Sequence, residues 1–158
     1  MSSAETHRAS RRFVVAQNVL LVLFMAIGLV VPKDLLFVSH TARLIGSVVA
    51  GVGVLLILLA VVSLRRLIQI APEPKSNGEL IQSGPYKHLR HPIYTGIILC
   101  VAGLFLRTPT IWIGIASLIV LVFLVLKARF EEDLLLERYA GYTEYRARTF
   151  GLFPGLRR

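Results

Sequence analysis

The amino-acid sequence predicts an all-α fold: a polytopic membrane protein with about four transmembrane helices, the last two a helical hairpin, and a cytoplasmic C-terminal amphipathic helix. Of the 158 residues, 55% are hydrophobic, and the mean hydropathy of +0.69 is well above that of a typical soluble domain. Charge-free apolar runs reach the roughly 20 residues with which a helix crosses a bilayer. The length suits one domain, so we expect residues 1–158 to form a single membrane-embedded unit.

The first two transmembrane helices are expected at residues 13–31 and 44–64, each an uninterrupted apolar run. A signal peptide is a poorer interpretation of the first run, because the run is longer than a usual apolar signal core and no small-x-small cleavage pattern follows it. The third and fourth helices are expected at residues 92–106 and 109–127. Pro109 predicts a tight turn between them, so these two helices should form the hairpin.

The basic residues predict the orientation. They precede the first apolar run, lie between the second and third, and follow the fourth, whereas only Lys33, Arg43 and Arg107 fall in the other two connections. We therefore expect both termini and the connection at residues 65–91 on the cytoplasmic side. The net charge of +9 would also suit a nucleic-acid binder, but these residues flank apolar runs and form no stripe, so we predict no nucleic-acid partner.

A few polar or reactive residues lie inside the apolar runs. Cys100 is the single cysteine, so one chain can form neither a disulfide framework nor a CxxC site, and we predict no metal centre. The simplest role for Cys100 is that of a small buried apolar residue. Gln17 and Asn18 are the most notable polar residues of the first run, and we expect both to pair helices.

The chain after the fourth run predicts an amphipathic helix over residues 128–149, within a C-terminal segment that extends to residue 155 and holds the breakers Gly151 and Pro154. Five side chains recur at helical spacing and should share one face: Glu131, Leu135, Arg138, Tyr142 and Tyr145. We see no internal repeat, so the functional residues must be sought in local motifs.

The segment before the third helix combines glycine, proline, tyrosine and ionisable residues in an unusually dense motif. Its notable members are Gly84, Pro85, Tyr86, His88, Arg90, His91, Pro92, Tyr94 and Gly96. Pro92 removes one backbone donor, which can leave a carbonyl near His91 free for a ligand. Polar side chains at the edge of a membrane are costly unless they are paired or functional. The alternative is that the basic residues are interfacial anchors and the tyrosines belong to an aromatic belt.

A second motif, Glu131-Glu132, follows the fourth apolar run. A helical hairpin would bring these carboxylates level with Arg90 and His91 at the start of the third helix. Taken alone, acidic residues here are more often a solvated face that pairs with neighbouring basic residues. The two motifs together favour a functional site.

These paired motifs resemble the isoprenylcysteine carboxyl methyltransferase family, and the related phospholipid methyltransferases share the pattern. The resemblance covers about residues 78–155. The first two expected helices of this chain match the family only in being apolar. It rests on Gly-Pro-Tyr at 84–86, Arg-His-Pro-x-Tyr-x-Gly at 90–96, Glu-Glu-x-x-Leu at 131–135, Tyr-x-x-Tyr at 142–145 and a later proline. One departure bears on the two tyrosines: residues 139–142 are one residue shorter than the family's usual spacing, and one residue turns a helix by about 100°.

The resemblance implies S-adenosylmethionine as cofactor, bound at the cytoplasmic face between residues 65–91 and the C-terminal helix. The implied cofactor-binding residues are Gly84, Pro85, Tyr86, His88, Arg90, His91, Pro92, Tyr94, Gly96, Glu131, Glu132, Tyr142 and Tyr145. Arg90, Glu131 and Glu132 are implied as catalytic. The residue types suit this cofactor, because its sulfonium, ammonium and carboxylate need acidic, basic and aromatic partners.

The expected acceptor is a lipid or a lipidated small molecule or protein at the membrane. Carboxyl O-methylation of the isoprenylcysteine type is the leading hypothesis, and N-methylation of an aminophospholipid is the alternative. A carboxylate is already ionised at pH 7, whereas an amine must first lose a proton to a base such as Glu131 or Glu132. An NADPH-dependent reductase resembling the sterol reductases and a non-catalytic membrane scaffold are two further interpretations.

Overall fold

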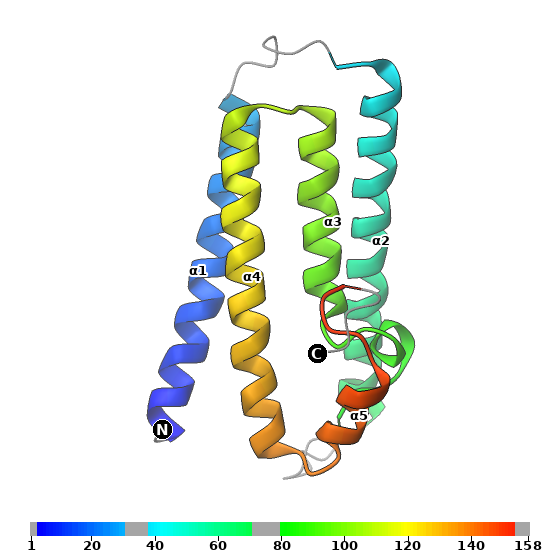
Figure 1. The fold of residues 1–158 in the computed structure, drawn as a ribbon. Helices are drawn as coiled ribbons and strands as arrows, with labels where there is room; N and C mark the ends of the chain where they lie inside the picture. Colours follow the sequence, from blue (N-terminus) through cyan, green and yellow to red (C-terminus); the bar gives the residue numbers. More distant parts are fainter. Residues whose placement is uncertain (1–2, 31–37, 71–79, 154–158) are drawn as a thin grey trace.

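The computed structural model describes residues 3–30, 38–70 and 80–153, which form long antiparallel helices with two short helices folded against one end (Figure 1). The elements are α1 (Ser3–Val30), α2 (His40–Ile70), the 3-10 helix η1 (Gly84–Lys87), α3 (Pro92–Arg107), α4 (Ile111–Arg138) and α5 (Tyr142–Arg148). Within the described residues no strand forms, and one isolated β-bridge joins Leu89 to Phe150. The all-α prediction is therefore confirmed for this part of the chain.

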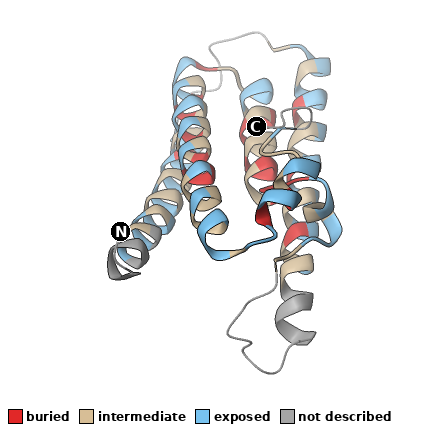
Figure 2. Ribbon diagram, turned by 60° about the horizontal axis from the view of Figure 1, so that its bottom comes forward, coloured by how far each residue is buried: buried red, intermediate tan, exposed pale blue. Residues whose placement is uncertain are grey.

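Within the described residues, three helices are long and apolar enough to cross a membrane: Arg11–Val30 within α1, His40–Leu64 within α2, and Ile111–Arg138, which is α4. Their outward-facing surfaces are largely exposed (Figure 2), and they carry apolar side chains such as Val22 and Leu118, as lipid-facing helices do. α3 has 16 residues, about 24 Å of helix, which is short of the roughly 20 residues that a crossing needs. The fourth crossing therefore stays a prediction.

Glycines bring α2 and α3 into backbone contact. A Cβ added at Gly46 would lie 2.6 Å from the Gly103 carbonyl oxygen, and one added at Gly53 would lie 2.6 Å from the Gly96 carbonyl oxygen. Gly46 and Gly53 are seven residues apart on α2, and Gly96 and Gly103 are seven residues apart on α3, as expected for two helices that run antiparallel. Between them the Cys100 thiol lies 3.5 Å from a backbone carbonyl of α2, and Cys100 is half-buried, whereas the sequence predicted a buried residue.

α1 and α4 meet through larger side chains. The ring of Phe13 on α1 packs against Phe130 on α4, with centroids 4.9 Å apart, and against Phe123 at 5.9 Å. The core of the bundle consists of seven buried residues: Phe24, Ile97, Val101, Ile113, Ala116, Val120 and Leu124. These residues come from α1, α3 and α4, so the core joins the two helix pairs.

The turn expected around Pro109 lies between α3, which ends at Arg107, and α4, which begins at Ile111. Thr110 caps α4, because its side-chain oxygen accepts a hydrogen bond from the Ile113 N–H at 3.2 Å. Although this turn makes α3 and α4 consecutive antiparallel helices, the backbone of α3 lies against α2. The reason is that the glycine faces of α2 and α3 fit each other, whereas α4 carries full-sized side chains.

Two predicted boundaries are wrong. The helix expected over residues 128–149 is not a separate element: α4 runs on to Arg138, and only Tyr142–Arg148 forms α5. Tyr139 adopts an extended conformation between them, and the resulting reversal buries Tyr142 and Tyr145. The five side chains predicted to share one face therefore lie on two helices.

The connection expected at residues 65–91 also begins later, because α2 continues to Ile70 and no glycine or proline interrupts residues 65–70. Residue 31, residues 71–79 of that connection and residues 154–155 of the predicted C-terminal segment lie outside the described residues.

Candidate functional site

The segment before α3 is built so that Arg90 and His91 lie at the end of the bundle. Gly84 begins η1 with a φ of +60°, a left-handed conformation that glycine adopts without steric cost. A Cβ at this position would also collide with the side chain of Ser63 on α2. Pro92 then starts α3, where its missing N–H costs nothing because the first turn of a helix leaves N–H groups unpaired.

The chain after α5 returns to this segment. The Arg90 N–H donates to the Phe150 carbonyl at 2.8 Å, and the Phe150 N–H donates to the His88 carbonyl at 2.9 Å. Thr95, in the first turn of α3, donates its hydroxyl hydrogen to the Leu152 carbonyl at 2.7 Å. The C-terminal part of the chain is thereby attached to the start of α3.

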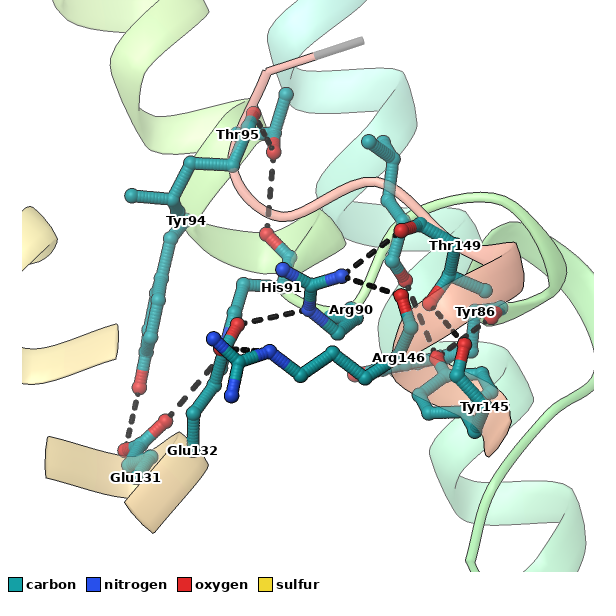
Figure 3. A network of polar contacts seen from close by, with 12 residues as sticks. Tyr86, Arg90, His91, Tyr94, Thr95, Glu131, Glu132, Tyr145, Arg146 and Thr149 are labelled. Atoms are coloured by element: carbon teal, nitrogen blue, oxygen red, sulfur yellow. Dashed lines mark hydrogen bonds and ion pairs between the residues drawn. The ribbon is translucent and has the colours of Figure 1, made fainter. Parts of the chain in front are cut away.

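Arg90 is the centre of the polar cluster (Figure 3). Its guanidinium is buried, and Nε donates to Glu132 Oε1 at 2.8 Å. Nη1 donates to two backbone carbonyls near the end of α5, those of Arg146 at 3.0 Å and Thr149 at 2.8 Å. The Arg146 side chain adds a second cation, 3.6 Å from Glu132 Oε2. One buried, charge-assisted network therefore joins the start of α3 to α4 and α5.

His91 faces both carboxylates. Its Nε2 lies 3.3 Å from Glu132 Oε1, and its Nδ1 lies 3.7 Å from Glu131 Oε2. The imidazole stacks on the ring of Tyr94, with centroids 5.4 Å apart and planes within 5°. These contacts leave the imidazole little rotational freedom.

Glu131 connects the site to α1. It accepts a hydrogen bond from the Tyr94 hydroxyl at 2.7 Å, and its Oε1 lies 3.7 Å from the ammonium of Lys127. Lys127 is buried, lies 5.0 Å from the centre of the Tyr94 ring, and donates to Gln17 on α1 at 2.5 Å. Gln17 therefore pairs helices, as expected. Asn18 does not, because its amide donates to the Val14 carbonyl of its own helix at 2.9 Å.

Two tyrosines of α5 support the segment before α3. The buried Tyr145 hydroxyl donates to the Tyr86 carbonyl at 2.7 Å, and burial raises the pKa of Tyr145 to about 12 from its ordinary value of 10.0. Tyr142 is fully buried, and its hydroxyl has no hydrogen-bond partner among the described residues. An unpaired buried hydroxyl costs about 1–3 kcal/mol, which a polar group of a ligand or water would offset.

Two cavities lie at this cluster. The first, of about 210 Å³, is lined by Tyr86, Arg90, His91, Pro92, Ile93, Tyr94, Glu131 and Leu135. The second, of about 440 Å³, is lined by Arg90, Val125, Ala128, Arg129, Glu132, Asp133, Arg146, Leu152 and Phe153. Because Arg90 lines both, the two cavities are neighbours and together present carboxylates, guanidinium groups, an imidazole and phenol rings.

The structure brings six of the predicted site residues to the first cavity: Tyr86, Arg90, His91, Pro92, Tyr94 and Glu131. Glu132 lines the second cavity and contacts both Arg90 and His91. The two separate motifs of the sequence therefore form one cluster.

The other predicted residues lie elsewhere. His88 lines a different cavity, Gly96 packs against α2, and Gly84 lies against Ser63. The Pro85 carbonyl accepts the Leu89 N–H at 3.0 Å, which is a contact within the loop. Tyr142 and Tyr145 line neither cavity of the cluster. Among the residues that the structure describes, no group of three or more His, Cys, Asp or Glu side chains could hold a metal ion.

Several members of the cluster were not singled out from the sequence. Arg146 and Thr149 contribute carbonyl oxygens, for which a sequence carries no signal, and Arg146 also contributes its guanidinium. In contrast, the sequence did offer Lys127, with Arg129 and Arg138, as a neighbour for the acidic motif, because Lys127 lies four residues before Glu131 on the same helix face, and the structure contains this pair. The contact of Lys127 with Gln17 depends on how α1 packs and could not be read from either residue alone.

The fold and the cluster define a class of protein: a helical membrane protein that holds a polar site of both charge signs at one end of apolar helices. The chain belongs to the phospholipid methyltransferase family, whose model matches residues 41–141, from the start of α2 to the residue before α5. The match to this family of methyltransferases confirms the resemblance found in the sequence. The matched region contains Arg90, His91, Glu131 and Glu132.

Among characterised proteins, the chain is similar to the cobalt-zinc-cadmium resistance protein CzcN of Cupriavidus metallidurans, with 31% identity over 85 residues. The alignment covers 52% of this chain and 38% of CzcN, so the chain spans less than two fifths of that relative's length. No solved structure matches the chain significantly.

Proposed function

We propose that the protein is an S-adenosylmethionine-dependent methyltransferase that acts on a lipid-bearing acceptor at the membrane. One observation carries this proposal: Arg90 and His91 at the start of α3 contact Glu131 and Glu132 near the end of α4 at 2.8–3.7 Å, around adjoining cavities. Membership of a methyltransferase family supports it. The three long apolar helices support a site next to lipid.

The residues of the cluster fit S-adenosylmethionine chemically. Glu131 and Glu132 suit its ammonium or ribose hydroxyls, and Arg90 suits its carboxylate. The rings of Tyr86 and Tyr94 suit its sulfonium or adenine. The first cavity is smaller than the roughly 300 Å³ of a usual ligand pocket, whereas the two cavities that share Arg90 together offer the space. We propose that Gly84, Pro85, Tyr142 and Tyr145 shape this site.

The cofactor, when bound, supplies an activated methyl group on its sulfonium. The chain contributes binding and orientation, which provide most of the acceleration when a transfer needs no proton in its central step. Arg90 fixes Glu132, and stacking on Tyr94 fixes His91, so both polar groups are already in place before a ligand arrives. Pro92, Ile93 and Leu135 are the apolar lining of the first cavity and help to exclude water.

The site favours a carboxylate acceptor of the isoprenylcysteine type. Both carboxylates already accept contacts: Glu132 from Arg90 and His91, and Glu131 from Tyr94. Taking a proton from an acceptor would disrupt these contacts. A carboxylate acceptor needs no base, whereas the amine of an aminophospholipid does, so N-methylation is the alternative.

We further propose that α3 is the fourth crossing, with the site and both termini on the cytoplasmic side. Arg90 and His91 directly precede α3, so this helix would begin at the membrane surface. The excess of basic residues in the connections at that end supports the orientation.

Calorimetry on the detergent-purified protein tests the cofactor. Binding of S-adenosylmethionine and S-adenosylhomocysteine, with no heat from NADPH, is the expected result. His91→Ala should weaken S-adenosylhomocysteine binding by about tenfold, the loss of one good polar contact, whereas His88→Ala should leave it within about twofold. Binding of NADPH alone would indicate a reductase, and no binding of any of the three would indicate a scaffold.

A transfer assay with labelled S-adenosylmethionine tests the acceptor. Label should pass to a prenylated cysteine and not to phosphatidylethanolamine. Transfer to phosphatidylethanolamine alone would replace the carboxylate proposal by N-methylation while preserving the methyltransferase assignment.

A further inference from the structure

A third polar cavity, of about 410 Å³, lies beside the site and plays no part in the proposed methyl transfer. It is lined by Gln82, Lys87, His88, Tyr145 and Arg148. Lys87 and His88 come from the end of η1 and the residue after it, and Arg148 is the last residue of α5. The cavity therefore spans two elements that are far apart in the sequence.

The charge of this cavity is positive. Lys87 and Arg148 line it, and none of the described residues that line it carries a carboxylate. Within the described part of the chain, neither of these cations forms an ion pair with Asp or Glu, although Arg148 donates to the Gln82 side chain. In contrast, Arg90 and Arg146 at the methyltransferase site share Glu132. Two cations without carboxylate partners suit the third cavity to an anion.

The cavity also lies close to the point where the apolar stretch of α2 ends. η1 begins at Gly84, which lies against Ser63, and Ser63 is next to the end of the apolar stretch His40–Leu64 of α2. The chain after η1 enters α3 at Pro92 within a few residues. A basic cavity beside the end of an apolar helix is suited to the phosphate of an anionic phospholipid.

We propose that this cavity binds the phosphate group of an anionic phospholipid, with Lys87 and Arg148 as its principal ligands and His88 as a further donor. A phosphate held between Lys87 and Arg148 links η1 to α5. Tyr145, which lines this cavity, also donates to the carbonyl of Tyr86, and the Tyr86 side chain lines the first cavity of the cluster. Lipid binding therefore stabilises the wall of the neighbouring site, and this role does not depend on the methyl acceptor.

The test uses the full chain in nanodiscs of phosphatidylcholine with increasing fractions of phosphatidylglycerol. Native mass spectrometry measures retained lipid, and thermal unfolding measures stability. The wild type should retain phosphatidylglycerol at least about tenfold in preference to phosphatidylcholine, as expected for two basic residues near a headgroup, and should gain thermal stability with it. Lys87→Gln/Arg148→Gln should lose both effects.

Arg11→Gln/Arg138→Gln is the matched control, because it removes the same charge from two exposed positions, one at the start of the apolar stretch of α1 and one at the end of α4. The N-terminal end of α1 and the C-terminal end of α4 lie at the same end of the bundle (Figure 1). It should keep the preference. Lys87→Gln alone guards against a folding defect, since the Lys87 side chain forms no hydrogen bond or ion pair with the described residues, and it should weaken the preference by several-fold. An undiminished preference in the double variant, or an equal loss in the control, would overturn the proposal.

Inorganic phosphate added to phosphatidylcholine nanodiscs distinguishes a lipid from a soluble source. It should stabilise the wild type far less than phosphatidylglycerol does. Equal stabilisation by inorganic phosphate would overturn the assignment to a lipid.

Discussion

The two helix pairs of this protein are held together by different means. α2 and α3 pack backbone against backbone at Gly46–Gly103 and Gly53–Gly96, and α1 and α4 meet through aromatic rings and the hydrogen bond from Lys127 to Gln17. The polar site lies where the pairs meet, because α3 supplies Tyr94 and follows directly on Arg90 and His91, and α4 supplies both carboxylates. Shape complementarity thus positions one half of the site, and a polar contact positions the other.

Breaking the contact between the pairs should have the largest effect. Arg90→Met leaves Glu132 without its closest cation and two carbonyls without a donor, so we expect a loss of about 3–5 kcal/mol in the free energy of unfolding. Denaturant titration in detergent measures it. Arg138→Met, at an exposed position on α4, is the control, and equal stability of the two variants would contradict a central role for Arg90.

Disrupting the glycine-packed pair should come next. A leucine at position 53 would push α2 away from Gly96, with an expected cost of about 3 kcal/mol. Gly51→Leu, on the same helix with no atom of another helix within 4 Å of its added Cβ, should cost far less. If thermal unfolding shows equal losses for the two variants, close packing is not what holds α2 to α3.

Weakening the other pair should have a smaller effect. Gln17→Leu removes the closest polar partner of the buried Lys127 ammonium, for an expected loss of about 2 kcal/mol, and should also weaken S-adenosylhomocysteine binding through Glu131. Asn18→Leu is the control, because Asn18 is exposed and, among the described residues, forms its side-chain hydrogen bond within α1. A stability loss without any change in binding would show that α1 supports the fold but not the site.

The smallest expected effect concerns the tyrosines of α5. Tyr145→Phe loses the hydrogen bond to the Tyr86 carbonyl and should cost about 1 kcal/mol, whereas Tyr142→Phe removes an unpaired hydroxyl and should be neutral or stabilising. The free energy of unfolding, measured for both variants in parallel, tests this prediction. A greater loss in Tyr142→Phe would show that its hydroxyl is paired in solution.

Stability at alkaline pH provides a second test of the role of Tyr145. Burial raises the pKa of Tyr145 to about 12 from an ordinary value of 10.0, so the folded state holds this proton more tightly than the unfolded state. The contribution of this shifted pKa to the free energy of unfolding is fully present below pH 10 and is lost as the pH rises to about 12. Between these values the wild type should lose stability more steeply than Tyr145→Phe, and parallel curves would count against the shift.

Local patterns made much of the fold predictable. Three of the expected apolar runs form helices long enough to cross a membrane, because span length depends only on a continuous stretch of apolar residues. The turn around Pro109 was predictable for a similar reason, since proline and a threonine cap act within a few residues. The two motifs of the site were also recognisable, because their residue types cluster in the sequence.

The errors arose where distant contacts override local pattern. Residues 128–149 have helical periodicity, yet the chain reverses after Arg138 because the reversal buries Tyr142 and Tyr145 against the segment before α3. His88 belongs to the same local motif as His91, but three residues along this irregular segment place it in a different cavity.

By itself, the sequence determined that the chain forms apolar helices of membrane-spanning length and that it carries two polar motifs of a methyltransferase family. These properties depend on hydrophobicity and on short-range spacing. Only the tertiary structure decided which helices pair, that Lys127 reaches Gln17, and that Arg90 binds carbonyls near the end of α5. Such contacts depend on the shapes of helices far apart in the chain and on backbone atoms that every residue shares.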